Sequence, residues 1–242
     1  MHPVIFHTKG KIMSFPPPDK NNIIDLLPAD LSAANEKNKK QFRFFSPLYD
    51  LSMKYIIRSK IHKASPRRHT RIWQELIGSV RQAKILDLAC GTGGLIDCLD
   101  KDNAYTGLDI SYEMLKKAAR RARRKKFTRC RLIRANAEDP IFSGHNFDRV
   151  VTDTALHMIP DWEKTLMAAA QSLGPQGVLT GALPVLGIDA AFDKGWGKYA
   201  SRPQFHALTT DDVQAACHAN HLDFTCIATN GGMLYFQACK KI

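Results

Sequence analysis

The stretch Lys84–Gly94, which reads KILDLACGTGG, decides the fold class of this 242-residue chain. Its apolar first half predicts a buried strand, and Asp87 stands inside that strand where a plain core would have another aliphatic side chain. Gly91 and Gly93 follow, and glycine permits positive φ and a close approach of a ligand to the backbone. A helix expected from Gly94 would point the amides of its first turn at that ligand. The stretch therefore predicts a strand, a glycine turn and a helix that bind a small anionic group.

Outside this stretch, short apolar runs alternate with runs of helical period. Strands are predicted over 84–88, 104–109, 131–134, 147–152, 177–183, 222–228 and 233–239, and helices over 94–100, 111–126, 161–173 and 210–220. This alternation predicts an α/β fold, in which a doubly wound parallel sheet is covered by helices on both faces. The short link at Asn230–Gly232 predicts a hairpin, so the final strand should run antiparallel to the others.

The chain divides into three parts on composition. Residues 1–40 contain Pro16–Pro18 and many lysines without a sustained period, which predicts a flexible arm. Residues 41–80 show apolar side chains at one-turn spacing, which predicts a helical cap. Residues 81–242 then form the core.

A long connection over 184–208 interrupts the core. It contains Trp196, Tyr199, Phe205 and His206 among glycines. Connections of this length are usually functional, so we expect a lid over the substrate.

The overall composition is typical of a soluble globular protein, with 44% hydrophobic and 24% charged residues. No run reaches the roughly 18 apolar residues of a membrane-spanning helix, and the first residues lack the order of a secretory signal. We therefore expect a cytoplasmic protein. The six cysteines form no CxxC pair, which predicts buried free thiols and no metal site.

The formal net charge of +12 is partly concentrated in one helix. Between Glu113 and Arg131 there are ten Lys or Arg residues and a single acid. The basic helix over 113–126 would attract an anionic membrane surface, which makes the protein a candidate for peripheral membrane association, or nucleic acid. A solvated helix face explains the same charges equally well.

Asp109, at the end of the run Tyr105–Asp109 (YTGLD), lies 18 residues after Gly91. A carboxylate at the end of the second strand can accept hydrogen bonds from both hydroxyls of a ribose. It could instead cap the helix that begins at Ser111. A dinucleotide site would need a third glycine where Ile96 stands, so the pattern favours a nucleoside that carries a carboxylate and an ammonium over a pyrophosphate.

Over residues 84–183 the strings DLACGTGG, GLDIS, RANAEDPIF and FDRVVTDTALHMIPDWEKTLMAAAQSLGPQGVL occur in this order. The chain here resembles class I S-adenosylmethionine-dependent methyltransferases of the ubiquinone/menaquinone-biosynthesis type (methyltransferase type 11). The resemblance implies a Rossmann-like seven-stranded sheet of order 3-2-1-4-5-7-6, S-adenosyl-L-methionine as cofactor and S-adenosyl-L-homocysteine as product. It implies cofactor-binding roles for Asp87, Ala89, Gly91, Gly93, Asp109, Ile110, Asn136, Ala137 and Thr152.

Three features qualify the resemblance. The family more often has Asp at Asn136, although an amide oxygen can still accept from the adenine amine. The stretch Thr152–Leu156 lacks the Arg-Asn pair of quinone-type enzymes, which counts against a benzoquinol substrate. The segment Phe44–Asp50 (FFSPLYD) is similar to one that folds over the cofactor in quinone-biosynthesis enzymes and bacterial phosphatidylethanolamine N-methyltransferases, so Tyr49 is expected to close the site.

Methyl transfer from a sulfonium is an in-line displacement, and a general base is needed only if the acceptor must lose a proton. Asp153 and His157, after the fourth strand, are the candidates, and the family histidine at this place is equally consistent with a structural role. We expect a small-molecule or lipid-headgroup acceptor. An RNA acceptor is an alternative, although no RNA-binding module and no NPPY-type motif is visible. A third alternative is a non-catalytic, cofactor-binding regulatory protein.

Overall fold

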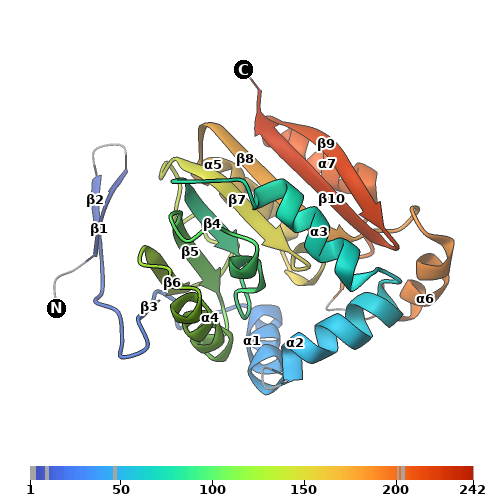
Figure 1. The fold of residues 1–242 in the computed structure, drawn as a ribbon, viewed down its shortest axis with the longest axis horizontal. Helices are drawn as coiled ribbons and strands as arrows, with labels where there is room; N and C mark the ends of the chain where they lie inside the picture. Colours follow the sequence, from blue (N-terminus) through green and yellow to red (C-terminus); the bar gives the residue numbers. More distant parts are fainter. Residues whose placement is uncertain (1–3, 9–10, 46–47, 201, 203–204, 242) are drawn as a thin grey trace.

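The structure is a computed structural model that describes residues 4–8, 11–45, 48–200, 202 and 205–241. Figure 1 shows a central sheet with helices packed on both of its faces. The strands of this sheet are β3 (Ile23–Asp25), β4 (Lys84–Leu88), β5 (Ala104–Asp109), β6 (Cys130–Arg134), β7 (Phe147–Asp153), β8 (Leu173–Pro184), β9 (Leu222–Asn230) and β10 (Met233–Lys240). A separate hairpin is formed by β1 (Val4–Thr8) and β2 (Lys11–Phe15).

The α-helices are α1 (Ala33–Phe45), α2 (Tyr49–Ser52), α3 (Pro66–Ile77), α4 (Tyr112–Arg124), α5 (Trp162–Ser172), α6 (Ala190–Ala200) and α7 (Thr210–Ala219). The π-helix η2 (Met53–Ile61) continues α2, and two single 3-10 turns are η3 (Gly94–Asp97) and η4 (Leu156–Met158).

The sheet has the order β3-β6-β5-β4-β7-β8-β10-β9. The seven predicted strands therefore occur in the predicted order 3-2-1-4-5-7-6, and β10 pairs antiparallel with both β8 and β9. The predicted count of seven was wrong, because β3 adds an eighth strand beside β6. Ile23 and Ile24 are buried there and the carboxylate of Asp25 pairs with Arg134 at 2.9 Å. A strand of three residues is too short to show a period in the sequence.

Two hydrophobic cores lie on opposite faces of the sheet. On one face, α3 and α4 bury side chains such as Trp73 and Leu115. On the other, α5 and α7 bury side chains such as Leu166 and Val213. Helix α4 begins close to the predicted residue 111, where the hydroxyl of Ser111 accepts a first-turn amide, and Ser65 caps α3 in the same way.

Regular structure also occurs within residues 1–40, which we expected to be a flexible arm. Besides the hairpin and β3, helix α1 begins at Ala33, and the hydroxyl of Ser32 accepts the amide of Asn35 at 3.2 Å. The side chains of Asn35 and Asn38 are buried, so the inner face of this helix carries polar residues. The periodicity of apolar residues in the sequence therefore does not reveal the helix. The division into arm, cap and core remains a prediction.

The two segments beside the predicted site also differ from expectation. The helix predicted over 94–100 is only the 3-10 turn η3, so few of its amides could face a ligand. The predicted lid over 184–208 contains the helix α6. Within it, Phe192 and Trp196 are fully buried, and their rings stack with centroids 5.1 Å apart.

Two expectations from composition can be compared with the structure. All six cysteines are free, but only Cys90 and Cys217 are buried, and Cys226 and Cys239 on the outer strands are exposed. Among the described residues, no helix combines the length and the apolar character that crossing a bilayer requires.

The loop between η2 and α3 is attached to the turn between β9 and β10 by Asn230. The side-chain oxygen of Asn230 accepts the amide of Ser65 at 2.9 Å, and its side-chain nitrogen donates to the carbonyl of Ser65 at 2.9 Å. Next to it, the amide of Gly232 donates to the carbonyl of His62 at 2.8 Å. The side chain of Asn230 is buried, and these bonds hold the cap to the sheet.

We predict that Asn230→Ala lowers the free energy of unfolding by about 1 to 3 kcal/mol, because two backbone groups of Ser65 lose their hydrogen-bond partner. Thr229→Ala, an exposed neighbour on the same strand, should change it by less than about 0.5 kcal/mol. Urea denaturation followed by circular dichroism measures both. Equal stabilities of the two variants would contradict the proposed attachment.

Candidate active site

Three adjoining cavities lie where β4, β5, β6 and β7 end. The central pocket, between these strand ends and α1, is lined by residues that include Ala89, Gly91, Asp109, Ile110, Asn136 and Ala137. The glycine-turn cleft, between the turn after β4 and the helices α2, η2 and α3, is lined by residues that include Arg58, His69, Asp87, Thr92 and Arg121. The aromatic chamber, between η2, η4 and α6, is lined by residues that include His62, His157, Trp196, Tyr199 and Phe205. Tyr49 and Thr154 line all three cavities.

The turn after β4 bends through three residues with positive φ, which are Ala89, Gly91 and Gly93. A Cβ on Gly93 would lie 2.8 Å from a side-chain carbon of Ile96 and 3.1 Å from Cβ of Ala118. Gly93 therefore lets α4 pack closely against the turn, and it lines none of the three cavities. Ala89 and Gly91 face both the central pocket and the glycine-turn cleft.

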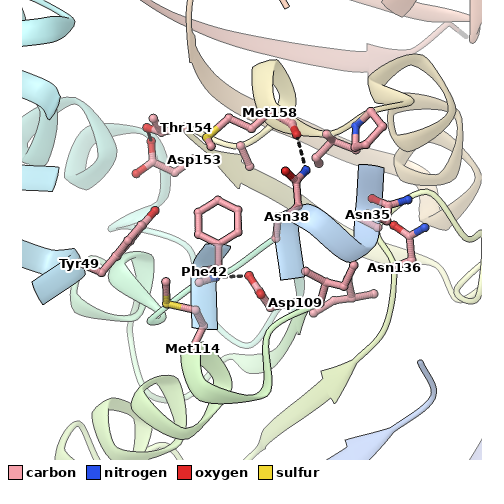
Figure 2. Close-up of a pocket in the computed structure, with 18 residues that line it drawn as sticks. Asn35, Asn38, Phe42, Tyr49, Asp109, Met114, Asn136, Asp153, Thr154 and Met158 are labelled. Carbon is pink, nitrogen blue, oxygen red and sulfur yellow. Dashed lines mark hydrogen bonds between the residues drawn. The ribbon is translucent and has the colours of Figure 1, made fainter. Parts of the chain in front are cut away.

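Asp109 faces the central pocket from the end of β5 (Figure 2). One carboxylate oxygen accepts the amide of Gly91 at 2.8 Å and the other accepts the amide of Ser111 at 2.8 Å. Burial raises the pKa of Asp109 to about 6, against the opposing effect of these two hydrogen bonds. The hydroxyl of Ser111 caps α4 by accepting the amide of Met114, so Asp109 is not needed as the cap. This leaves the carboxylate available to a ligand.

Helix α1 covers the central pocket. Asn35, Asn38 and Phe42 point from it into the pocket in Figure 2. The side-chain amide of Asn38 donates to the carbonyl of Met158 at 2.8 Å, and that of Asn35 donates to Glu138 at 2.9 Å. None of these three residues was predicted from the sequence. Their spacing of three and four residues, which places them on one helix face, was the signal that could have found them.

Asn136 is engaged with its own turn. Its side-chain oxygen accepts the amide of Glu138 at 3.2 Å, and its side-chain nitrogen donates to the carboxylate of Glu138 at 3.1 Å. The same carboxylate accepts the amide of Asp161 at 3.1 Å. Ile110 and Ala137 line the central pocket beside it.

Asp87 and Thr152 do not line the central pocket. Asp87 is buried at the glycine-turn cleft, where Tyr105 donates its hydroxyl to it at 2.7 Å. Burial raises the pKa of Asp87 to about 8, and the hydrogen bond from Tyr105 counteracts this only in part. Thr152 is buried in β7, lines none of the three cavities, and its hydroxyl has no hydrogen-bond partner among the described residues.

The cap is joined to the glycine turn by Asp50. One carboxylate oxygen of Asp50 accepts the hydroxyl of Thr92 at 2.6 Å, and the other pairs with Arg121 of α4 at 2.8 Å. These bonds place the ring of Tyr49 over Gly91, 3.9 Å from where a Cβ of that residue would stand. Burial raises the pKa of Tyr49, so its hydroxyl stays protonated.

Asp153 is held in a chain of polar side chains. Its carboxylate pairs with Arg58 at 3.3 Å and with Nε2 of His69 at 3.2 Å, and Nδ1 of His69 lies 2.7 Å from the hydroxyl of Tyr235. Burial opposes ionisation, but His69 and Arg58 outweigh it and hold the pKa of Asp153 well below its usual range. Asp153 is therefore ionised at neutral pH and is a weak proton acceptor.

The aromatic chamber contains two neutral histidines. Burial lowers the pKa of His62 to about 3, and burial together with His62 lowers the pKa of His157 well below its usual value. The ring of His157 stacks on Phe205 with centroids 6.0 Å apart. Within the described part of the chain, Nδ1 of both histidines and Nε1 of Trp196 are buried without a hydrogen-bond partner. Unpaired buried polar groups are costly, which is typical of a site that a ligand completes.

Comparison with known proteins finds a family that resembles the central part of the chain. Residues 85–177 match the family described as "Methyltransferase domain". The demethylmenaquinone methyltransferase of Listeria welshimeri is 30% identical over 148 residues, which are 60% of this chain, and the chain spans 61% of that relative's length. The enzyme of the same name from Staphylococcus carnosus is 31% identical over 150 residues, 60% of this chain and 59% of its own length.

Solved structures share the fold at low sequence identity. Phosphoethanolamine N-methyltransferase 2 of Haemonchus contortus, in complex with S-adenosyl-L-methionine, superposes with a TM-score of 0.66 at 14% identity, over 89% of this chain and 62% of that one. The [4+2]-cyclase SpnF superposes with a TM-score of 0.66 at 15% identity, over 89% of this chain and 98% of its own. The matched segment contains the glycine turn and the acid that ends β5. Residues 85–177 thus match the methyltransferase domain family, and the strand order of the sheet agrees with the fold of the superposed structures.

Proposed function

We propose that the protein transfers a methyl group from S-adenosyl-L-methionine to a small, largely apolar acceptor that contains a ring and is bound in the aromatic chamber. The observation that carries this proposal is that Tyr49 and Thr154 line all three cavities. A cofactor that extends from the central pocket into the glycine-turn cleft passes this junction. Its methyl group would there face the aromatic chamber.

In this proposal the central pocket holds the adenosine of the cofactor. Asp109 accepts the ribose hydroxyls, Ile110 and Ala137 pack on the adenine, and Asn136 borders its amino group. Ala89 and Gly91 carry the chain past the methionine part, and Asp87 in the cleft lies where a carboxylate could pair with the ammonium. Thr152 and Gly93 then support the site through packing, because neither lines a cavity.

The bound cofactor supplies an activated methyl group, so the side chains mainly align donor and acceptor. Tyr49 lies over the glycine turn and excludes water from the junction. Asp153 stays ionised, so we assign it the role of a fixed negative charge beside a cationic ligand and not that of a base. If the acceptor must lose a proton, His157 is the candidate to accept it, because it lines the chamber and its Nδ1 has no partner in the described structure.

The chemistry of the chamber favours an apolar acceptor over a phosphate-bearing headgroup. Its two histidines are neutral, and Arg202 is the cation that the described lining offers. Most of the remaining lining is aromatic or aliphatic, which suits stacking on a ring. The relatives are named demethylmenaquinone methyltransferases, which supports an acceptor with a ring, while the missing Arg-Asn pair argues against one of the benzoquinol type.

Two other functions remain distinguishable by experiment. An RNA acceptor would use the basic face of α4, which lies outside the three cavities except for Arg121. A non-catalytic protein would bind the cofactor and transfer no methyl group. The similarity to the [4+2]-cyclase SpnF is a reminder that one fold can carry different functions. Incubation with labelled cofactor and separate pools of metabolites, lipid extract and RNA tests all three. Label in RNA alone, or in no pool, would contradict the proposal.

We predict that S-adenosyl-L-methionine binds and that Asp109→Asn weakens this binding roughly 10- to 100-fold, because charge-assisted hydrogen bonds to the ribose are lost. The affinity of the unmodified protein should fall as the pH is lowered through about 6, since protonation of Asp109 removes an acceptor. Calorimetric titration at several pH values measures both effects.

Asp25→Asn provides the control, because Asp25 is an exposed carboxylate outside the cavities that pairs with Arg134 and accepts the amide of Leu27. It should bind the cofactor as the unmodified protein does. A pH profile of Asp109→Asn that still falls at about pH 6 would show that another group is responsible. Heat on titration with NAD but not with S-adenosyl-L-methionine would overturn the cofactor assignment itself.

We predict that Phe205→Ala and Trp196→Ala lower kcat/KM for the acceptor at least about tenfold, because stacking area in the chamber is lost, while cofactor affinity changes less than about twofold. Phe224→Ala is the matched control. Its ring is partly buried too, but it stacks on Phe236 at the far strand of the sheet. Unchanged acceptor kinetics in both chamber variants would place the acceptor elsewhere.

A further inference from the structure

The outer surface of the cap exposes a row of large apolar side chains. Five large hydrophobic side chains are exposed among the described residues, and four of them fall within nine consecutive positions: Leu48 at 67%, Leu51 at 59%, Tyr55 at 57% and Ile56 at 50%. We call these four residues the cap patch. Single exposed apolar side chains are common on soluble proteins, but a cluster of this kind indicates an interaction surface.

The cap patch follows a helix. Helices α2 and η2 run without interruption from Tyr49 to Ile61, and the spacing of three and four residues between Leu48, Leu51 and Tyr55 places them along one side. In Figure 1 this helix forms the edge of the molecule below the sheet. Ile56 also lines the aromatic chamber, so the patch borders the cavity that we assign to the acceptor.

The charges around the cap patch are almost all positive. Between Leu48 and Arg71 the chain has seven Lys or Arg residues and one acid, Asp50. Asp50 is bound by Thr92 and Arg121, and Arg58 is paired with Asp153. In the described part of the chain, six cations have no ion-pair partner: Lys54, Lys60, Lys63, Arg67, Arg68 and Arg71.

An apolar row with cations beside it matches the interface of an anionic bilayer. Side chains such as Leu51 can enter the boundary between headgroups and acyl chains, and lysines nearby can contact the negative headgroups. Tyr55 suits this depth as well, because its ring is apolar and its hydroxyl polar, and Nζ of Lys54 lies 5.1 Å from the centre of that ring.

We infer that the cap patch binds reversibly to the surface of an anionic membrane and presents the aromatic chamber to acceptor molecules dissolved in the bilayer. The inference about the acceptor rests on the proposed function, whereas the binding to the membrane does not. A second copy of the chain fits the patch less well, because the unpaired cations of two caps would face each other. Duplex nucleic acid would engage the cations and leave the apolar side chains in water.

The basic face of α4 is the alternative candidate for a membrane-binding surface. Arg120, Arg123 and Arg124 of that helix are exposed, but none of the large hydrophobic side chains that are exposed among the described residues lies on α4. A surface that carries only charge is attracted weakly to an anionic membrane, and salt screens this attraction. Binding through inserted apolar side chains persists at high salt. The two surfaces can therefore be separated by mutation.

The test is flotation of the full chain with vesicles of phosphatidylcholine that contain about 30% phosphatidylglycerol, and with vesicles of phosphatidylcholine alone. The variant Leu48→Gln/Leu51→Gln/Tyr55→Gln alters the patch and avoids every residue that lines a cavity. Ile227→Gln changes the exposed apolar side chain on β9 and is the matched control. Arg120→Glu/Arg123→Glu tests the face of α4.

We expect the unmodified chain and Ile227→Gln to bind the anionic vesicles at least about tenfold more tightly than the triple variant, and to bind neutral vesicles weakly. Tyr55→Trp should show quenching of its fluorescence by brominated lipid, which reports insertion without altering the rest of the patch. Cofactor titration of the same samples establishes that the variants are folded and is independent of the vesicle result.

Several outcomes would overturn the inference. One is the absence of vesicle binding by the unmodified chain, whether or not it binds the cofactor. Another is full binding by the triple variant with loss in Arg120→Glu/Arg123→Glu, which would place the contact on α4. A concentration-dependent dimer that the triple variant abolishes, in a chain that does not bind vesicles, would assign the patch to a second copy.

Discussion

The buried carboxylate of Asp109 joins the parts of the site that the sheet alone would leave unconnected. It accepts the amide of Gly91 in the glycine turn and the amide of Ser111 at the start of α4, so the ends of two neighbouring strands share one anchor. Burial raises its pKa to about 6, which means that the ionised form is held at a cost in free energy. A ligand that donates hydroxyl groups to this oxygen pair would reduce that cost. Order in the turn and affinity for a nucleoside are therefore linked through the same side chain.

The cap depends in turn on the position of the glycine turn. Asp50 reaches Thr92 in the turn and Arg121 on α4, and Asn230 fixes the other end of the cap to the sheet. Between these two attachments runs the helix whose inner side lines the chamber and whose outer side is the cap patch. One short segment thus meets the glycine-turn cleft, the aromatic chamber and the surrounding solvent. Its position is set by a few polar bonds at its ends and not by a large apolar interface.

The elements that the sequence predicted well are those buried by a simple pattern. Strand 84–88 and its acid-ended neighbour 104–109 were placed correctly because most of their side chains are apolar and buried and both are followed by turn residues. β3 was missed because three residues show no period, and α1 was missed because it buries Asn35 and Asn38. Asp109 could be predicted from its distance to the glycines. The pairing of His62 with His157 and Trp196 could not, because it joins segments far apart in the chain that only the folded cap and α6 bring together.

The position of α1 over the central pocket has a kinetic consequence. Asn38 is bonded to Met158 and Asn35 to Glu138, so this helix is held down on both sides of the cavity. In the proposed function, these two bonds would have to open before a spent cofactor beneath the helix is released, so the helix would slow product release. The same helix would protect a bound cofactor from exchange with solvent between reactions. Substitution of Asn35 or Asn38 would then change the residence time of the bound cofactor without changing the reacting groups.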